Sequence, residues 1–175
     1  MSKLREIPVF LFTGFLESGK TKFIQETLED KRFNSGERTL LVVCEEGEEE
    51  YEPDKFSAPN VFTVSVEEPS QLTRDNFRKW IDEHDCERCV IEYNGMWILD
   101  ELYQALPEMW MVYQEFFFAD ARSIISYNTN MRSLVYDKLK SAELVVFNRY
   151  NDSIDKMELH RLARAETECR RRSRS

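Results

Sequence analysis

The chain has 175 residues, of which 42% are apolar, and its formal net charge is −9. This length supports one hydrophobic core and argues against two large domains, while the negative charge argues against nucleic acid as a partner. The four scattered cysteines and the lack of any long apolar stretch indicate a cytoplasmic protein that needs no disulfides and has no membrane partner.

Short β-rich segments alternate with segments of helical periodicity along the sequence. The predicted strands are 7–12, 39–44, 61–66, 89–93, 111–118 and 144–147. The predicted helices are 21–33, 70–83, 98–106, 123–139 and 153–167. Ser70 and Ser153 are the predicted N-caps of two of these helices. The order predicts an α/β fold of the P-loop NTPase type, a three-layer, doubly wound, mostly parallel sheet with ligands at the carboxyl ends of its strands.

No linker divides the sequence, so we expect residues 1–167 to form one nucleotide-binding domain. Residues 168–175 are rich in arginine and lack apolar periodicity. They predict a basic, disordered tail, although an arm that contacts RNA or a membrane surface is an alternative for such a run.

Residues 14–21 read G-F-L-E-S-G-K-T between the first predicted strand and the first predicted helix. A glycine loop in this place predicts a phosphate-binding site, because backbone N–H groups converge on an anion at a helix N-terminus. The predicted phosphate-binding residues lie in this loop: Gly14, Glu17, Ser18, Gly19, Lys20 and Thr21. Lys20 would reach the outer phosphates, and the Thr21 hydroxyl would ligate Mg²⁺. The alternative is a glycine-bearing turn that binds nothing.

Polar residues follow several other predicted strands. Glu92 and Gly95 follow the fourth strand, where an acidic residue holds Mg²⁺ and a glycine N–H approaches the γ-phosphate in P-loop hydrolases. Glu45 opens the acidic run 45–52, and it is a predicted metal ligand, whereas most of that run is expected to be a solvated loop. Metal ligands are therefore predicted at Thr21, Glu45 and Glu92, and catalytic roles at Lys20, Glu92 and Gly95. Asn148 follows the last strand and would face the purine base, although asparagine is also a common turn former.

Two further clusters have structural explanations. The lone pair Cys86 and Cys89 has no second cysteine or histidine pair at zinc-finger spacing, so burial explains it better than a metal site does. The aromatic residues of 110–118 predict sheet core under helices. A partner surface at Trp97, Trp110 or Tyr113 is the alternative.

These segments together resemble the CobW/HypB/UreG family of P-loop GTPases, specifically its CobW-like branch. The resemblance rests on the loop 14–21, a first switch at 44–47, the E-x-x-G of 92–95, Asp120-Ala121, and Asn148-Arg149-Tyr150-Asn151 in place of N-K-x-D. It implies Mg²⁺-dependent binding and slow hydrolysis of GTP, with GTP or GDP as ligand, coupled to metal delivery or to maturation of a metalloprotein client.

The sequence also departs from that family. Glu17 replaces a glycine in the phosphate loop, which implies weaker binding, and Asn151 replaces the aspartate that accepts from guanine, which implies a reduced guanine preference. The stretch 61–72 has no C-x-C-C metal motif, and we expect the family's C-terminal domain to be missing.

The sequence thus predicts a GTPase, with two alternatives. One is a nucleotide-binding switch or interaction module with little turnover. The other is a P-loop small-molecule kinase, which would need an arginine-bearing lid, and only Arg122 and Arg132 lie between the fourth and sixth strands. The oligomeric state is not predicted.

Overall fold

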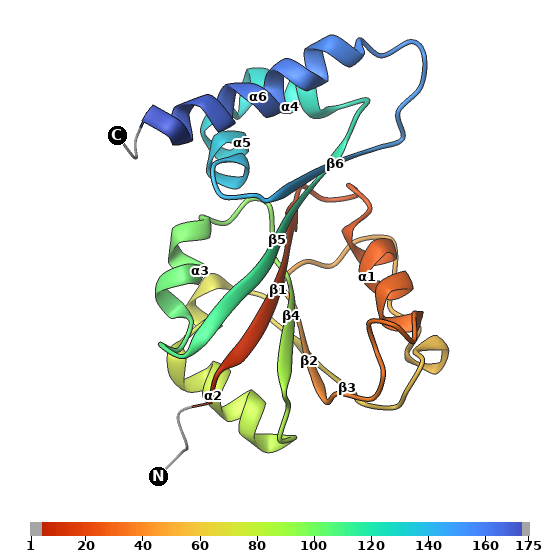
Figure 1. Ribbon diagram of the computed structural model, residues 1–175, viewed down its shortest axis with the longest axis vertical. Coiled ribbons are helices and arrows are strands. Elements are labelled where there is room, and N and C mark those ends of the chain that lie inside the picture. The colour runs from red at the N-terminus through yellow and green to blue at the C-terminus, as the bar shows by residue number, and fades with distance from the viewer. Residues whose placement is uncertain (1–4, 173–175) are drawn as a thin grey trace.

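The computed structural model describes residues 5–172, with side chains described through Arg164. Its strands form one parallel sheet in the order β3-β2-β4-β1-β5-β6 (Figure 1). The strands are β1 (Ile7–Gly14), β2 (Thr39–Val43), β3 (Val61–Ser65), β4 (Arg88–Glu92), β5 (Trp110–Asp120) and β6 (Leu144–Asn148). The six predicted strands are therefore confirmed, with β5 extended at both ends.

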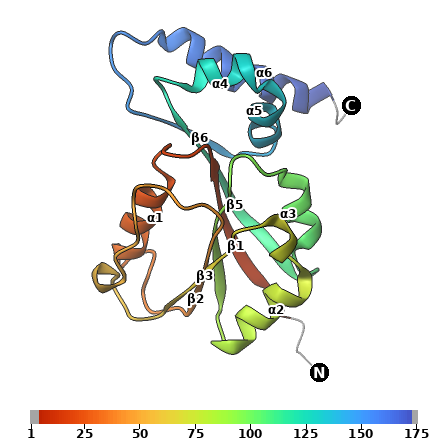
Figure 2. The same cartoon turned by 180° about the vertical axis from the view of Figure 1, so that it is seen from behind.

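Helices cover both faces of this sheet. One face is covered by α1 (Lys20–Glu29), and the other by α2 (Arg74–Glu83) and α3 (Leu99–Ala105) (Figures 1 and 2). The helices α4 (Ile124–Asn130), α5 (Arg132–Leu139) and α6 (Lys156–Arg172) pack together beside β5 and β6. Two short 3₁₀ turns, η1 (Pro53–Lys55) and η2 (Pro69–Gln71), complete the described elements. The predicted three-layer α/β fold is confirmed.

The central strand β1 is apolar on both faces, as a parallel strand between two helical layers must be. Val9 and Leu11 belong to the core under α2 and α3, whereas Phe12 belongs to the core under α1. All three side chains are fully or almost fully buried. This packing fixes the register of β1 against β4 and β5, and with it the positions of the loops that follow the strands.

The chain changes direction in the sheet between β1 and β4. From β1 it passes through α1 to β2 on one side, and from β4 it passes through α3 to β5 on the other. Ligands of doubly wound sheets bind at the carboxyl ends of the strands at such a switch point. The loops after β1 and β4 meet there.

Both predicted serine caps are wrong. Ser70 lies in η2, and α2 begins after Thr73, whose side-chain oxygen accepts a hydrogen bond from the Asn76 N–H at 3.1 Å. Ser153 bonds to the Asn151 side chain within a turn. The helix α6 begins three residues later, where the Asp155 carboxylate accepts from the Met157 N–H at 2.9 Å. In both cases a later polar residue caps the helix.

The single helix predicted over 123–139 is also wrong. It is divided into α4 and α5 at Met131, whose φ of −133° and ψ of 47° are not helical. The end of α4 contains Thr129 and Asn130, whose side chains bond to the carbonyl oxygens of Ile125 and Ser126. Such side chains compete with the backbone for hydrogen bonds and weaken a helix.

The aromatic cluster and the cysteine pair have different outcomes. Trp110, Phe117 and Phe118 are buried as predicted, but Tyr113 is 67% exposed, so its predicted core position is wrong. Cys86 and Cys89 are buried free thiols, as their explanation by burial requires. The predicted tail 168–175 overlaps α6, which runs to Arg172, so its residues 168–172 are helical rather than disordered, whereas residues 173–175 and the side chains of the tail lie outside the described part of the chain.

Candidate functional site

The loop between β1 and α1 is closely packed against the end of β6. Gly19 precedes α1 with a φ of 97°, and a side chain there would collide with the amide of Asn148. The Asn148 Nδ2 lies 3.5 Å from the Ser18 carbonyl oxygen, at the limit of a hydrogen bond. Asn148 therefore lies against the loop, while its contact with a base stays a prediction.

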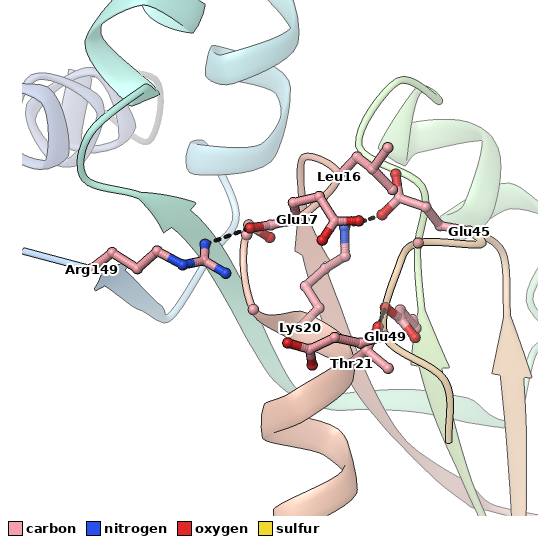
Figure 3. A pocket seen from close by; sticks show the side chains of 11 residues that line it. Leu16, Glu17, Lys20, Thr21, Glu45, Glu49 and Arg149 are labelled. Atoms are coloured by element: carbon pink, nitrogen blue, oxygen red, sulfur yellow. Dashed lines mark hydrogen bonds and ion pairs between the residues drawn. The ribbon is translucent and has the colours of Figure 1, made fainter. Parts of the chain in front are cut away.

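Lys20, the first residue of α1, is buried and folds back over the loop. Its ammonium donates to the carbonyl oxygens of Gly14 and Phe15 and pairs with the Glu45 carboxylate at 2.5 Å. The exposed fractions of the two side chains are 2% and 8%. Lys20 and Glu45 point toward one another across the site (Figure 3). The predicted phosphate-binding cation thus has a carboxylate beside it.

The predicted metal ligands are only partly brought together. The Thr21 hydroxyl donates to Glu92 Oε1 at 2.6 Å, so these two residues lie side by side as a shared metal site requires. The other oxygen of Glu92 accepts from the Tyr51 hydroxyl at 2.5 Å. Burial raises the pKa of Glu92, and burial together with the Glu92 charge raises the pKa of Tyr51, so Tyr51 remains a hydrogen-bond donor. Glu45 instead pairs with Lys20.

Gly95 lies where the loop after β4 meets the end of β1. A Cβ atom on Gly95 would lie 2.8 Å from the Gly14 carbonyl carbon and 2.9 Å from the Phe15 Cα. Only glycine allows the two backbones to approach this closely. The predicted residue is therefore placed next to the loop 14–21, and its response to a γ-phosphate stays a prediction.

Arg149 and Tyr51 are residues of the site that sequence reasoning missed. The Arg149 guanidinium donates to the Glu17 carbonyl oxygen at 2.6 Å and pairs with Asp120 at 3.0 Å. Its position in the motif that resembles N-K-x-D was the signal for it, because the family has a lysine there. Tyr51 lies at the end of the acidic run, and no motif marks it.

The loop before α1, the acidic run, Glu92 and Arg149 line one pocket at the carboxyl edge of the sheet (Figure 3). Its lining residues are Leu16, Glu17, Ser18, Gly19, Lys20, Thr21, Glu45, Gly47, Glu49, Glu92 and Arg149. It encloses about 20 Å³, which is room for about one water molecule. A phosphate group would therefore need Lys20 to exchange its contact with Glu45 for a contact with the ligand.

The pocket fits a phosphate ligand in one specific respect. The Ser18 side chain is 2% exposed, and its hydroxyl has no hydrogen-bond partner among the described residues. A buried polar group without a partner is costly and points to a missing ligand or water. Thr21 and Glu92 supply the oxygen ligands that Mg²⁺ prefers. The described side chains hold no group of three His, Cys, Asp or Glu residues that could bind a metal ion.

Among the described residues no helix is long and apolar enough to cross a membrane. The sequence matches neither a protein-family model nor any of the curated proteins with which it was compared.

Proposed function

We propose that this chain binds a purine nucleotide, GTP or GDP, with its phosphates in the loop 14–21. The observation that carries the proposal is the start of α1, where a buried ammonium and an unpartnered buried hydroxyl line the same pocket. Helix N-termini of this kind favour anions, and Lys20 adds a full positive charge to them.

Each residue of the site then has a specific role. Lys20 and Ser18 would bind phosphate oxygens, Thr21 and Glu92 would hold Mg²⁺, and Asn148 would orient the base. Bound Mg²⁺ would neutralise charge on the phosphates during hydrolysis. Gly95 would place its backbone N–H near the terminal phosphate, and Arg149 would keep the loop closed from the other side. Hydrolysis by positioning alone is slow, because no side chain is assigned as a base.

We further propose that the chain is a CobW-like P-loop GTPase. We also propose that it works in the cytoplasm, which agrees with the free thiols of Cys44, Cys86 and Cys89. Service to a metalloprotein client rests on the resemblance alone. A nucleotide-binding switch with little turnover is the second candidate, and the pairing of Glu45 with Lys20 favours it. A carboxylate next to the phosphate-binding cation weakens binding through charge repulsion.

Melting temperature measured with GDP, GTP, ADP and ATP, with and without Mg²⁺, tests the proposal. Guanine nucleotides should raise the melting temperature with concentration, and Lys20→Ala should abolish this rise. Lys22→Ala is the matched control, because Lys22 is an exposed lysine of the same helix. No shift with any nucleotide would refute the proposal, and a shift with Mg²⁺-ATP alone would favour the kinase.

A further inference from the structure

The acidic segment 45–52, called the strap below, crosses the candidate phosphate site as an irregular chain. Glu46, Gly47, Glu48, Glu49 and Glu50 are exposed, as predicted for a solvated loop. The strap nevertheless contacts the site and the helix beside it at four places along its length. These contacts determine which groups of the site are free to bind a ligand.

Two contacts use residues that the proposed function assigns to the ligand. At one end of the strap, the Glu45 carboxylate pairs with the Lys20 ammonium at 2.5 Å. Near the other end, the Tyr51 hydroxyl donates to Glu92 Oε2 at 2.5 Å. The Glu45 carboxylate lies beside Lys20, in the place proposed for a phosphate. The Tyr51 hydroxyl bonds to an oxygen of Glu92 that is proposed to bind Mg²⁺.

The other two contacts fasten the strap to the body. The Glu17 carboxylate accepts from the Glu48 N–H at 3.0 Å, and a Cβ atom on Gly47 would lie only 2.8 Å from the same carboxylate. The Gln25 side chain bonds to both the N–H and the carbonyl oxygen of Glu52, at 2.9 and 3.1 Å. Glu17 has a φ of 59°, a region that L side chains seldom adopt, so its place in the loop has an energetic cost.

We infer that the strap is an autoinhibitory device, in which Glu45 and Tyr51 occupy Lys20 and Glu92 until a nucleotide displaces them, and Glu17 holds the strap in this position. The inference rests on the proposed function, because it gives that site its regulation. It also gives a role to the glutamate inside the loop 14–21, since the Glu17 carboxylate accepts a strap N–H.

Strap contacts and ligand contacts then compete for the same two side chains, Lys20 with a phosphate and Glu92 with Mg²⁺. Without Mg²⁺, a Tyr51 variant acts by releasing the strap, and with it Glu45, from the site. A hydrogen bond to a charged group contributes enough free energy to change a binding constant about tenfold when it is removed. Removal of a strap contact should therefore strengthen nucleotide binding about tenfold, which is the opposite of what loss of a ligand-binding group does.

The test measures GDP affinity by titration calorimetry without Mg²⁺, together with amide hydrogen exchange of residues 46–52 in the ligand-free protein. The variants are Glu17→Gly, Tyr51→Phe and Glu45→Gln, and the control is Glu50→Gln, which removes the same charge from an exposed strap side chain. Without Mg²⁺, any metal-binding role of Glu45 does not affect the result. Three variants are used because Glu45→Gln alone leaves Lys20 without its buried carboxylate.

We expect the three variants to exchange faster than wild type over the strap and to bind GDP about tenfold more tightly, while Glu50→Gln changes neither quantity. Faster exchange with unchanged or weaker GDP binding would overturn the strap inference and leave the proposed function standing. Slow exchange in all the variants would overturn the inference as well. Failure of wild type and all loosened variants to bind GDP would overturn the proposed function, and the inference with it.

Discussion

Two buried lysine–carboxylate pairs in this molecule differ in the rigidity of their surroundings. Lys20 pairs with Glu45 at 2.5 Å and Lys138 pairs with Asp137 at 2.8 Å, and the two lysine side chains are 2% and 0% exposed. The partner of Lys138 is the adjacent residue of α5, whereas the partner of Lys20 lies on the irregular strap. Only the Lys138 pair is fixed on both sides by regular structure.

Hydrogen bonds to neighbouring backbone groups satisfy both members of the Lys138–Asp137 pair. Its ammonium donates to the Trp97 carbonyl oxygen at 2.7 Å, and the Asp137 carboxylate accepts from the Leu99 N–H at 2.9 Å. Burial lowers the pKa of Lys138, while the bond to Asp137 opposes this change. A buried ion pair breaks at high cost when neither partner can reach water. Lys138 is therefore structural, whereas Lys20 borders a pocket, where the proposed ligand would replace its partner.

The largest expected effect comes from Lys138→Met. This variant leaves Asp137 buried with fewer partners, and we expect the free energy of unfolding in urea to fall by about 3 kcal/mol. Lys140→Met is the control, because the Lys140 ammonium also pairs with Asp137 but its side chain is 30% exposed. That variant should lose less than about 1 kcal/mol. Equal losses in both variants would break the contrast between buried and accessible pairs.

Gly95→Ala should have the next largest effect. The added methyl group would overlap the backbone of Gly14 and Phe15 and push the loop 14–21 away from β4. Overpacking of this kind costs about 2 kcal/mol, measurable by urea unfolding. If the alanine variant is as stable as wild type, the loops around Lys20 can move to make room for the methyl group, and they are then no more rigid than the strap.

Much of this arrangement is contained in the sequence. The strands, the phosphate loop and the positions of Thr21, Glu92 and Asn148 follow from apolar runs that end in polar residues, because parallel strands bring their carboxyl ends to one edge. The pairing of Glu45 with Lys20 could not be predicted. It depends on how an irregular segment without periodicity crosses the site, and the sequence suggested a metal ligand there instead.

Local hydrogen bonds and tertiary packing explain the other differences between the predicted and the observed structure. Thr73 and Asp155 are as good caps as the predicted serines, and the choice between nearby candidates depends on tertiary packing. The break at Met131 follows side-chain hydrogen bonds of Thr129 and Asn130 to the backbone of α4, whereas the exposure of Tyr113 depends on which neighbours cover it. Arg149 belongs to a motif that the sequence shows. Its backbone is left-handed, with a φ of 55°, and the sequence does not predict this conformation or the bond to Glu17 that accompanies it.

Low pH should weaken the ion pairs of Asp120, and the expected loss of stability is smaller than that of Gly95→Ala. Hydrogen bonds from Arg122 lower the pKa of Asp120 from 3.8 to about 2, with a further contribution from Arg149. Asp120 therefore contributes stability above about pH 3.8 that is lost as the pH falls toward 2. We expect Asp120→Asn to cost about 1 kcal/mol at pH 7, because exposure of Arg122 weakens the pair.

Urea unfolding between pH 7 and pH 2 measures this contribution. The difference between wild type and Asp120→Asn should shrink as the pH falls, whereas Asp152→Asn, in the exposed turn after β6, should follow wild type. A difference that grows at low pH would contradict the assigned role of the Asp120 pairs.

Lys20→Met should have the smallest effect on stability. Its burial matches that of Lys138, but the Glu45 carboxylate lies on the irregular strap, so we expect it to turn toward water when its partner is removed. We expect the free energy of unfolding to change by no more than about 1 kcal/mol. A loss as large as that of Lys138→Met would show that the Lys20 pair is also structural, and the contrast between the two pairs would be wrong.

The claim that Lys20 binds the phosphates of a nucleotide is tested most directly by titration calorimetry with GDP and with guanosine. The two ligands share the base and the ribose, so the difference in their affinities measures the phosphate contacts. We predict that GDP binds at least about 100-fold more tightly than guanosine, or about 2.7 kcal/mol, and that most of this difference disappears in Lys20→Met. Equal affinities of wild type for the two ligands, or a difference that Lys20→Met leaves intact, would contradict the claim.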